Sequence, residues 1–306
     1  MNHFLNLADL KPDELLALLD LAVELKAEWQ SGGNRPVLKG KTLGLVFQKP
    51  SLRTRVSFEM AMIHLGGQAL YLSPFEIKLG ERESVPDVAR VLSRYVDGIM
   101  ARVFAHADIL TLAEYSRVPV VNGLSDYNHP CQGLADLLTI VENKGRDLKG
   151  RKLVFIGDGN NVATSLLFGA ALLGMDFTIA GPPGYEMPAA VWALGEKFAA
   201  ASGSNLLATH DPQEAVTGAD AVYTDVWASM GQEEEAQERA RIFQPYQVNE
   251  ELIAQAKPDV IAMHCLPAHR GQEITDGVCD GPHSVLWDQA ENRMHAQKAI
   301  LAKLMG

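Results

Sequence analysis

A short segment rich in hydroxyl and guanidinium side chains, Ser51-Leu52-Arg53-Thr54-Arg55, follows the apolar run 43–47 and leads into a helical pattern over residues 56–65. A strand that delivers the chain to a helix N-terminus presents unpaired backbone N–H groups and the positive end of the helix dipole, and both favour a bound phosphate. The hydroxyls add donors, and the guanidinium groups can hold phosphate or carbamate oxygens bidentately. The segment predicts an anion cradle or, alternatively, a capped helix with two solvated arginines.

Other polar side chains of the first half also stand near the ends of apolar runs. Arg102 ends the run 98–102, and His129-Pro130-Cys131-Gln132 opens a helical pattern after the run 118–122. A helix N-terminus lowers the pKa of a histidine, so a neutral His129 could donate a hydrogen bond to a carbonyl, with Gln132 beside it. The alternatives are a surface arginine for Arg102 and a helix cap or a core polar group for His129.

The second half repeats this arrangement with different chemistry. Asn160 and Asn161 follow the run 152–157, where an amide could hold an α-carboxylate. Asp225 ends one run and is followed by Ser229-Met230-Gly231, while His264-Cys265-Leu266-Pro267 ends another. A nucleophilic pair of the Cys265 thiol with His129 or His264 is one interpretation of these residues, and an inert core thiol is the other.

The segment Gly157-Asp158-Gly159-Asn160-Asn161-Val162 is close to a dinucleotide-binding glycine pattern but departs from it twice. Val162 occupies the position of the third glycine, and the next predicted strand ends in Ala180-Gly181-Pro182-Pro183 without the acid that binds a ribose. We therefore expect no NAD, and a dehydrogenase is disfavoured.

Apolar β-rich runs and helical patterns alternate along the chain. We predict strands at residues 43–47, 69–72, 98–102, 118–122, 152–157, 177–180, 221–226 and 259–265. We predict helices at residues 12–30, 56–65, 87–95, 106–115, 132–143, 162–173, 189–201, 249–256 and 288–305. The alternation predicts an α/β fold with two open parallel-sheet domains, helices on both faces of each sheet, and interdomain helices that join them. Ligands of such sheets bind beyond the carboxyl ends of the strands, where the polar residues described above lie.

Length and composition exclude several classes of function. The 306 residues suit two domains of about 150 residues each. A net charge of −11 disfavours a nucleic acid or an anionic membrane as partner. The charge is uneven, with −1 on residues 1–150 and −10 on residues 151–306, so an anion meets less repulsion in the first half. Three cysteines without a Cys-x-x-Cys motif make disulfides and structural zinc unexpected. Without a long apolar run or an export signal, we expect a cytoplasmic protein.

Together, the Ser51–Arg55, His129–Gln132, Asp225…Gly231 and His264–Pro267 motifs resemble those of the transcarbamylase family over essentially the whole chain. The Ser-Met-Gly and His-Cys-Leu-Pro motifs resemble the ornithine-type members, and the aspartate-type members lack them. The resemblance implies transfer of the carbamoyl group of carbamoyl phosphate to the δ-amine of L-ornithine, giving L-citrulline and phosphate, as in arginine biosynthesis. It implies direct attack, with no covalent intermediate, no cofactor and no metal.

The resemblance also implies a place for each substrate. Residues 1–135 with the C-terminal helix 288–306 would bind carbamoyl phosphate, and residues 136–287 would bind ornithine. The implied contacts of carbamoyl phosphate are Ser51, Leu52, Arg53, Thr54, Lys78, Arg102, His129, Gln132, Cys265, Leu266 and Arg293. Those of ornithine are Asn161, Asp225, Ser229 and Met230, and the implied catalytic residues are Arg102, His129, Asp225 and Cys265.

Family members form catalytic homotrimers in which each site borrows a residue from the neighbouring subunit, so a homotrimer or an assembly of trimers is implied. The borrowed residue is usually glutamine, and here its position is occupied by Lys78 in Ile77-Lys78-Leu79-Gly80. Three alternatives remain open: an N-acetylornithine acceptor, a putrescine acceptor, or a non-catalytic binding protein on the same fold. N-acetylornithine lacks an α-ammonium and would gain less from Asp225, so the intact motif at residues 225–231 favours free ornithine.

Overall fold

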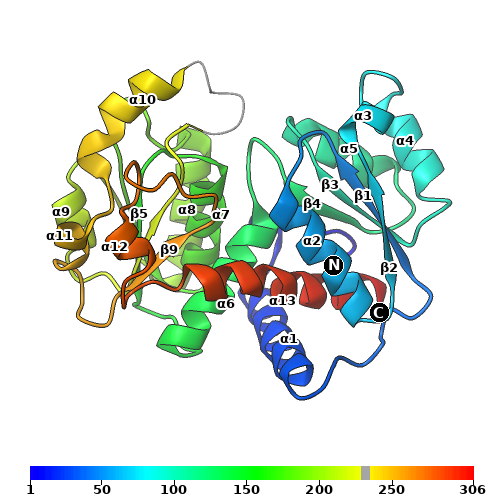
Figure 1. Cartoon of the computed structure of the whole chain (residues 1–306), viewed down its shortest axis with the longest axis horizontal. Coiled ribbons are helices and arrows are strands. Elements are labelled where there is room, and N and C mark those ends of the chain that lie inside the picture. Colours follow the sequence, from blue (N-terminus) through cyan, green and yellow to red (C-terminus); the bar gives the residue numbers. More distant parts are fainter. Residues whose placement is uncertain (229–234) are drawn as a thin grey trace. The chain divides into compact units, whose positions relative to one another are not determined.

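The computed structural model describes residues 1–228 and 235–306, which form two compact units (Figure 1). Unit 1 comprises Met1–Leu138 and Glu291–Gly306, and unit 2 comprises Thr139–Ala290. The limits expected from the sequence, 135/136 and 287/288, lie three residues before these on the chain. Helices α6 (Pro130–Lys144) and α13 (Leu286–Met305) contain the points at which the chain passes from one unit to the other.

Unit 1 is built on a four-stranded parallel sheet of order β2-β1-β3-β4. Its strands are β1 (Thr42–Phe47), β2 (Gln68–Leu72), β3 (Gly98–Arg102) and β4 (Val120–Leu124). Because Phe47 pairs with Arg102, the chain leaves β1 toward Ser51 beside the residue that ends β3. The sheet therefore places two of the predicted anion-binding segments at one edge.

Unit 1 also contains helices, several of which lie on its sheet. They are α1 (Pro12–Gln30), α2 (Leu52–His64), α3 (Pro74–Ile77), α4 (Val85–Leu92), α5 (His106–Tyr115), the first part of α6 and most of α13, preceded by the short η1 (Leu7–Asp9). Helices α4 and α5 share one buried apolar cluster with β1, β3 and β4. Hydrogen bonds tie the segment of α1 and its following loop to α13: Lys26 Nζ donates to Asn292 Oδ1 at 2.8 Å, and Lys298 Nζ donates to Asn34 Oδ1 at 2.7 Å. Helix α13 thereby holds Arg293 in unit 1.

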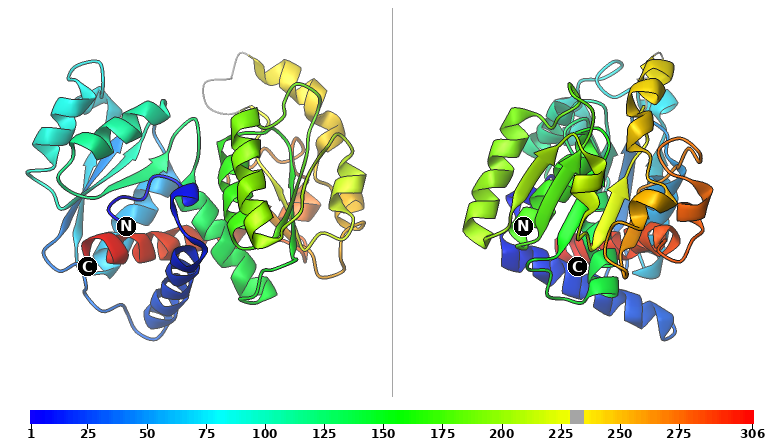
Figure 2. Two further views of the ribbon diagram at one scale, coloured as in Figure 1. Left: turned by 180° about the vertical axis from the view of Figure 1, so that it is seen from behind. Right: turned by 90° about the vertical axis from the view of Figure 1, so that its left-hand side faces the viewer.

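Unit 2 is built on a five-stranded parallel sheet of order β7-β6-β5-β8-β9. Its strands are β5 (Lys152–Ile156), β6 (Asp176–Ala180), β7 (Leu206–Thr209), β8 (Ala221–Thr224) and β9 (Ile261–His264). The helices are α7 (Asn161–Leu172), α8 (Ala189–Ser202), α9 (Pro212–Val216), α10 (Ala236–Phe243), α11 (Glu250–Ile253) and α12 (Asp276–Cys279), with the short η3 (Gln244–Tyr246). Figure 2 shows helices on both faces of this sheet, so the predicted doubly covered parallel α/β architecture is confirmed.

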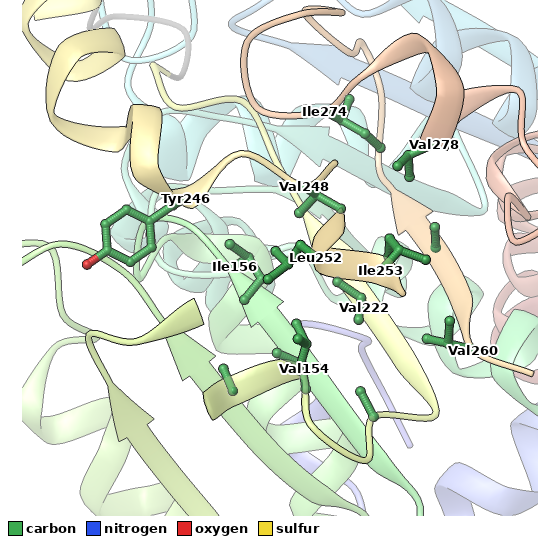
Figure 3. Close-up of a cluster of buried hydrophobic side chains, with 14 of the residues drawn as sticks. Val154, Ile156, Val222, Tyr246, Val248, Leu252, Ile253, Val260, Ile274 and Val278 are labelled. Atoms are coloured by element: carbon green, nitrogen blue, oxygen red, sulfur yellow. The ribbon is translucent and has the colours of Figure 1, made fainter. Parts of the chain in front are cut away.

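One apolar cluster of unit 2 lies between the sheet and the short helices that follow β7, β8 and β9 (Figure 3). Val154 and Ile156 of β5 and Val222 of β8 pack there against Leu252 and Ile253 of α11. The strand order reverses between β5 and β8, and such a reversal opens a crevice at the carboxyl ends of the two strands. The core thus fixes the two strands that lead to Asp158 and Asp225.

The structure differs from the sequence prediction at several elements. Strand β7 and the short helices α3, α9 and α12 were not predicted, and neither was α10. Helix α2 begins at Leu52 instead of residue 56, because the Ser51 hydroxyl accepts a hydrogen bond from the Thr54 N–H and caps the helix there. Residues 52–55 therefore form the first helical turn and not a loop. No helix in the described part of the chain is long and apolar enough to cross a membrane.

Candidate active site

The hydroxyl of Thr54 is the centre of a buried polar cluster in unit 1. Its Oγ1 accepts a hydrogen bond from Arg293 Nη2 at 2.8 Å, lies 3.4 Å from Arg102 Nη1, and accepts from Ser51 Oγ at 3.1 Å. Thr54 is fully buried, and both arginines are less than a tenth exposed. Helix α2, strand β3 and helix α13 each supply one part, so the structure brings Ser51, Thr54, Arg102 and Arg293 together as predicted.

Positive charge dominates the surroundings of this cluster. Burial and the neighbouring Arg102 charge lower the pKa of Lys49. Burial, and then the charges of Arg293, Arg102 and Lys49, hold the pKa of His129 well below its usual value. Several cations gathered around a neutral imidazole suit a polyanionic ligand. The expected neutral His129 agrees with this direction, and burial is the largest cause of its lowered pKa.

Gln132, in the first turn of α6, offers a hydrogen-bond acceptor. Its Nε2 donates to Asp136 Oδ1 at 2.8 Å, which orients the amide. Its Oε1 is buried and has no hydrogen-bond partner among residues 1–228 and 235–306. An acceptor without a partner is costly when buried, and an amide –NH₂ of a ligand would satisfy it.

The other residues around α2 have different environments. Arg53 belongs to the first turn of α2. Arg55, expected to help hold an anion, instead pairs with Glu59 at 2.9 Å, and its guanidinium lies 3.9 Å from the centre of the Tyr71 ring. Leu52 has an exposed side chain, so only its backbone N–H, at the start of α2, suits an anion.

Lys78 lies elsewhere in unit 1, at the C-terminal end of α3. Its backbone is left-handed, with φ 45° and ψ 57°, and its side chain is exposed. A residue other than glycine adopts this conformation at a cost, which is often associated with a functional position.

In unit 2 the carboxylate of Asp225 is the hub. Its Oδ2 accepts from Asn160 Nδ2 at 2.8 Å, and its Oδ1 accepts from Cys265 Sγ at 2.9 Å and from the Val226 N–H at 2.8 Å. Asp225 is 8% exposed. We call Asp225, Asn160 and Cys265 the Asp225 cluster, and it joins the carboxyl ends of β5, β8 and β9. A largely buried carboxylate held this way suits a cationic amine.

The remaining residues predicted to bind ornithine are less fully described. Asn161 is the first residue of α7 and lies next to the Asp225 cluster in the chain. Ser229 and Met230 lie outside the described residues. Asn160, which the sequence analysis noted but did not select, caps α7 by accepting from the Val162 and Ala163 N–H groups, besides donating to Asp225.

The glycine segment of unit 2, residues 157–162, packs closely against another backbone segment. A Cβ on Gly159 would lie 2.4 Å from the Met187 backbone nitrogen, so this glycine allows two backbone segments to pack closely. Asn160 already accepts from the first N–H groups of α7, the groups that bind a pyrophosphate in dinucleotide folds. Gly159 thus has a packing role that requires no nucleotide.

His264 fixes the turn that follows β9. Its Nδ1 accepts from the Leu266 N–H at 2.8 Å, so its Nε2 carries the hydrogen and donates to Glu273 Oε1 at 3.1 Å. Leu266 has a left-handed backbone with φ 61°. The histidine is therefore a buried neutral support for the Cys265–Leu266 backbone, and not the partner of a nucleophilic thiol.

One group of possible metal ligands overlaps this site. Ligand atoms of Asp225, His264 and Cys265 lie within 4.8 Å of one another. Both ring nitrogens of His264 and the Cys265 thiol already make hydrogen bonds to protein atoms. The arrangement is accounted for as a hydrogen-bonded cluster, and we assign it no metal.

Two cysteines of the predicted motifs have opposite surroundings. Burial raises the pKa of Cys131 to about 12, and its Sγ donates to the Asn122 carbonyl at 3.3 Å. Cys265 is partly exposed, and its thiol donates to a carboxylate. Cys131 is thus a core thiol, whereas Cys265 is a partly exposed member of the Asp225 cluster.

Sequence reasoning missed three residues that support the Asp225 cluster. Arg239 of α10 forms a buried ion pair with Asp158, and Glu273 supports His264. Asp158 follows a strand and could have been found from that position. Arg239 and Glu273 do not follow a strand directly. Nothing in the sequence indicates that they pair with Asp158 and His264, so the sequence carries no signal for them.

Comparison with known proteins gives a consistent picture. Residues 2–142 match the family model "Aspartate/ornithine carbamoyltransferase, carbamoyl-P binding domain", and residues 149–304 match "Aspartate/ornithine carbamoyltransferase, Asp/Orn binding domain". The chain is 57% identical over 300 residues to an ornithine carbamoyltransferase of Pyrococcus abyssi, covering 98% of this chain and 94% of that protein. It is 56% identical to the anabolic ornithine carbamoyltransferase of Pyrococcus furiosus, covering 98% and 95%.

Solved structures agree with this comparison. The structure of ornithine carbamoyltransferase from Pyrococcus furiosus superposes with a TM-score of 0.97 at 56% identity, covering 100% of this chain and 97% of that one. Two domain models in order along the chain, high identity over nearly its full length and a shared fold lead to one conclusion: the chain belongs to the aspartate/ornithine carbamoyltransferase family.

Proposed function

We propose that the chain transfers the carbamoyl group of carbamoyl phosphate to the δ-amine of L-ornithine, giving L-citrulline and phosphate. The observation that carries the proposal is the Asp225 cluster, a buried carboxylate that accepts from Cys265 Sγ at 2.9 Å and Asn160 Nδ2 at 2.8 Å. A carboxylate with a thiol beside it suits an aliphatic amine. The relatives that bear the name ornithine carbamoyltransferase support the same acceptor.

Unit 1 supplies the anion chemistry of the reaction. Arg53 and Ser51, at the N-terminus of α2, hold the phosphate and stabilise it as it departs. Thr54, Arg102 and His129 donate to the carbonyl oxygen as it becomes an oxyanion, an effect that reaches roughly 3–4 kcal/mol per donor in other enzymes. Gln132 Oε1 accepts from the carbamoyl –NH₂, and Arg293 holds Thr54 and the ligand in register. Among the other predicted contacts, Leu52 donates its backbone N–H to the phosphate, and Cys265 and the Leu266 backbone contact the carbamoyl group.

Unit 2 supplies the amine chemistry. A free alkylammonium has a pKa of about 10.4, so the δ-amine must lose a proton before it attacks. Asp225 and Cys265 bind and orient the amine, and Asp225 takes up its proton directly or through the thiol, which then passes its own proton to Asp225 as it accepts that of the amine. Asn161 with Ser229 and Met230 holds the rest of ornithine. Because phosphate is already a good leaving group, the attack is direct and needs neither a covalent enzyme intermediate nor a metal.

The direction and place of the reaction are further proposals. The Pyrococcus furiosus relative is named as anabolic, which favours citrulline formation in arginine biosynthesis over the reverse reaction. The cytoplasmic location expected from the sequence stays a prediction.

We also propose that the protein works as a homotrimer. Leu52, Val56 and Ile63 form an exposed apolar stripe on α2, and Leu70 is exposed on the edge strand β2. Phe75 of α3, three residues before Lys78, is 88% exposed. Apolar side chains beside an unpaired sheet edge favour association with further copies of the chain, and a head-to-tail contact that closes forms a ring. Lys78 would then bring its ammonium to the phosphate in the neighbouring subunit.

The reaction is tested by a product assay with carbamoyl phosphate and four acceptors: L-ornithine, N-acetylornithine, putrescine and aspartate. We expect citrulline from ornithine, with the other three acceptors at least about 100-fold slower, because a site built for paired polar groups discriminates by more than a few kcal/mol. A faster reaction with N-acetylornithine or putrescine would replace the proposed acceptor. No product with any amine would favour the non-catalytic alternative.

The anion cradle is tested with two neighbouring arginines. Arg53→Ala removes a guanidinium from the first turn of α2 and should lower kcat/KM for carbamoyl phosphate by about 100-fold or more, as the loss of a charge-assisted anion contact does. The matched control, Arg55→Ala, removes the arginine that pairs with Glu59 and should stay within about threefold, since an exposed ion pair is weak. Tight binding of carbamoyl phosphate to the Arg53 variant, measured by calorimetry, would contradict the cradle.

The role of the thiol is tested with the two cysteines. Cys265→Ser should raise the KM for ornithine or lower kcat, by about 10- to 100-fold, while binding of carbamoyl phosphate persists. Cys131→Ser is the control, because that thiol is buried and bonded to a backbone carbonyl. Equal rates for the wild type and the Cys265 variant at all ornithine concentrations would make Cys265 an inert core thiol.

The assembly is tested by light scattering of the purified protein. We expect a particle of about 100 kDa, three times the 33.3 kDa chain. Ile63→Glu should dissociate it, since a buried unpaired charge opposes association, while Leu110→Glu on α5 should not. A wild-type monomer that is fully active would overturn both the trimer and the borrowed lysine.

A further inference from the structure

Arg239, in helix α10, is almost wholly buried. Its guanidinium donates to the Asp158 carboxylate and to the Trp227 carbonyl, and it lies 3.7 Å from the Glu235 carboxylate. Its carbon also lies 4.8 Å from the centre of the Tyr185 ring, within the range of a cation–π contact. Together these contacts fix the orientation of the Arg239 side chain.

These contacts join segments that lie far apart in the chain. Asp158 follows β5, and Trp227 follows β8, the neighbouring strand in the sheet. Trp227 and Glu235 flank residues 229–234 on their two sides, with Ala228 between Trp227 and that segment. One side chain therefore fixes the chain beyond two strand ends and on both sides of the Ser-Met-Gly motif.

The same segments set the position of Asp225. The Asn160 N–H donates to the Asp158 carbonyl at 2.7 Å, and Asn160 Nδ2 donates to Asp225 Oδ2 at 2.8 Å. Asp225 also lies two residues before Trp227, whose carbonyl Arg239 holds. Arg239 thus reaches Asp225 by two routes, through the β5–α7 loop and through the chain that follows β8.

Charge gives a second reason for an arginine here. Asp158 is a second carboxylate close to Asp225: burial raises the pKa of Asp158, the Asp225 charge raises it further, and Arg239 lowers it. With Arg239 present, the charge of Asp158 is neutralised within the protein. Without it, Asp158 would be an unpaired carboxyl group beside Asp225, able to bind a proton or the ammonium of a substrate in place of Asp225.

We propose that Arg239, through its ion pair with Asp158, is a positioning residue that leaves Asp225 as the carboxylate for the amine of ornithine. The inference deepens the proposed function and rests on it. It assigns Arg239 no contact with the substrate, and it predicts an effect on the amine substrate alone.

The experiment compares the wild type with Arg239→Gln, Arg239→Lys, Asp158→Asn and the double variant Arg239→Gln/Asp158→Asn. Steady-state rates are measured against each substrate. Arg239→Gln should raise the KM for ornithine by about 10- to 100-fold, the usual effect of losing a group that orients a ligand-binding residue. The affinity for carbamoyl phosphate, measured by calorimetry, should stay within twofold. Arg239→Lys should be intermediate, because an ammonium cannot reproduce the forked contacts.

The double variant distinguishes a loss of orientation and charge balance at Asp225 from a loss of folding. Since Asp158→Asn removes the carboxylate that Arg239 neutralises, the double variant should recover at least threefold of the affinity for ornithine lost in Arg239→Gln. The control Arg241→Gln changes an exposed arginine two residues along the same helix and should leave both substrates unaffected.

The outcomes are distinct. An ornithine KM unchanged in Arg239→Gln, equal losses for both substrates, or no recovery in the double variant would each overturn the inference. If Arg239→Gln does not fold, as judged by thermal unfolding, Arg239→Lys and Asp158→Asn decide by the same split between substrates. A wild type that makes no citrulline would instead overturn the proposed function.

Discussion

The hydrogen bonds that Asp225 accepts are the constraint on which the site of unit 2 depends. A carboxylate that is 8% exposed has lost most of its water and must be compensated by donors. Those donors are Asn160, Cys265 and the Val226 N–H, and they come from the carboxyl ends of three parallel strands. Only the order in which β5, β8 and β9 lie side by side brings them within hydrogen-bond distance. The strand order of the sheet therefore determines which donors Asp225 can bind.

In the buried polar cluster of unit 1 the charged groups are cations, in contrast to the carboxylate of unit 2. There the hub is an uncharged hydroxyl, Thr54, which accepts from two guanidinium groups and neutralises neither of them. His129 stays neutral because burial and these charges oppose its protonation. Two guanidinium groups and a neutral imidazole gathered in this way suit a bound dianion. Residues 1–150 are also nearly neutral overall while residues 151–306 carry −10, so local and overall charge favour the same assignment of substrates.

The sequence was informative where a functional side chain lies next to the end of its own strand or the start of its own helix. Ser51, Arg102 and Asp225 could be found in this way, because in a parallel sheet such residues share one edge. Arg239 could not, since its partner Asp158 is 81 residues away and its charged helix looks like solvated surface. The edge strand β7 was missed for a different reason: its apolar run, Leu206-Leu207-Ala208, is only three residues long, and none of its residues is buried. Local pattern predicts elements and their ends, whereas pairing between distant side chains depends on packing.

The two motif cysteines show why residue type alone could not assign the chemistry. Cys131 donates to a backbone carbonyl in a dry environment that raises its pKa to about 12, so it cannot supply a thiolate. Cys265 donates its hydrogen to Asp225. In this arrangement the thiol acts as a hydrogen-bond donor, and it is not a thiolate nucleophile. His264 cannot activate it either, because Nδ1 is occupied by the Leu266 N–H and Nε2 by Glu273. The imidazole of His264 holds the Leu266 backbone and Glu273, so within the described part of the chain the geometry disfavours a covalent thiol intermediate. In the proposed reaction it is therefore Asp225 that takes the proton of the amine.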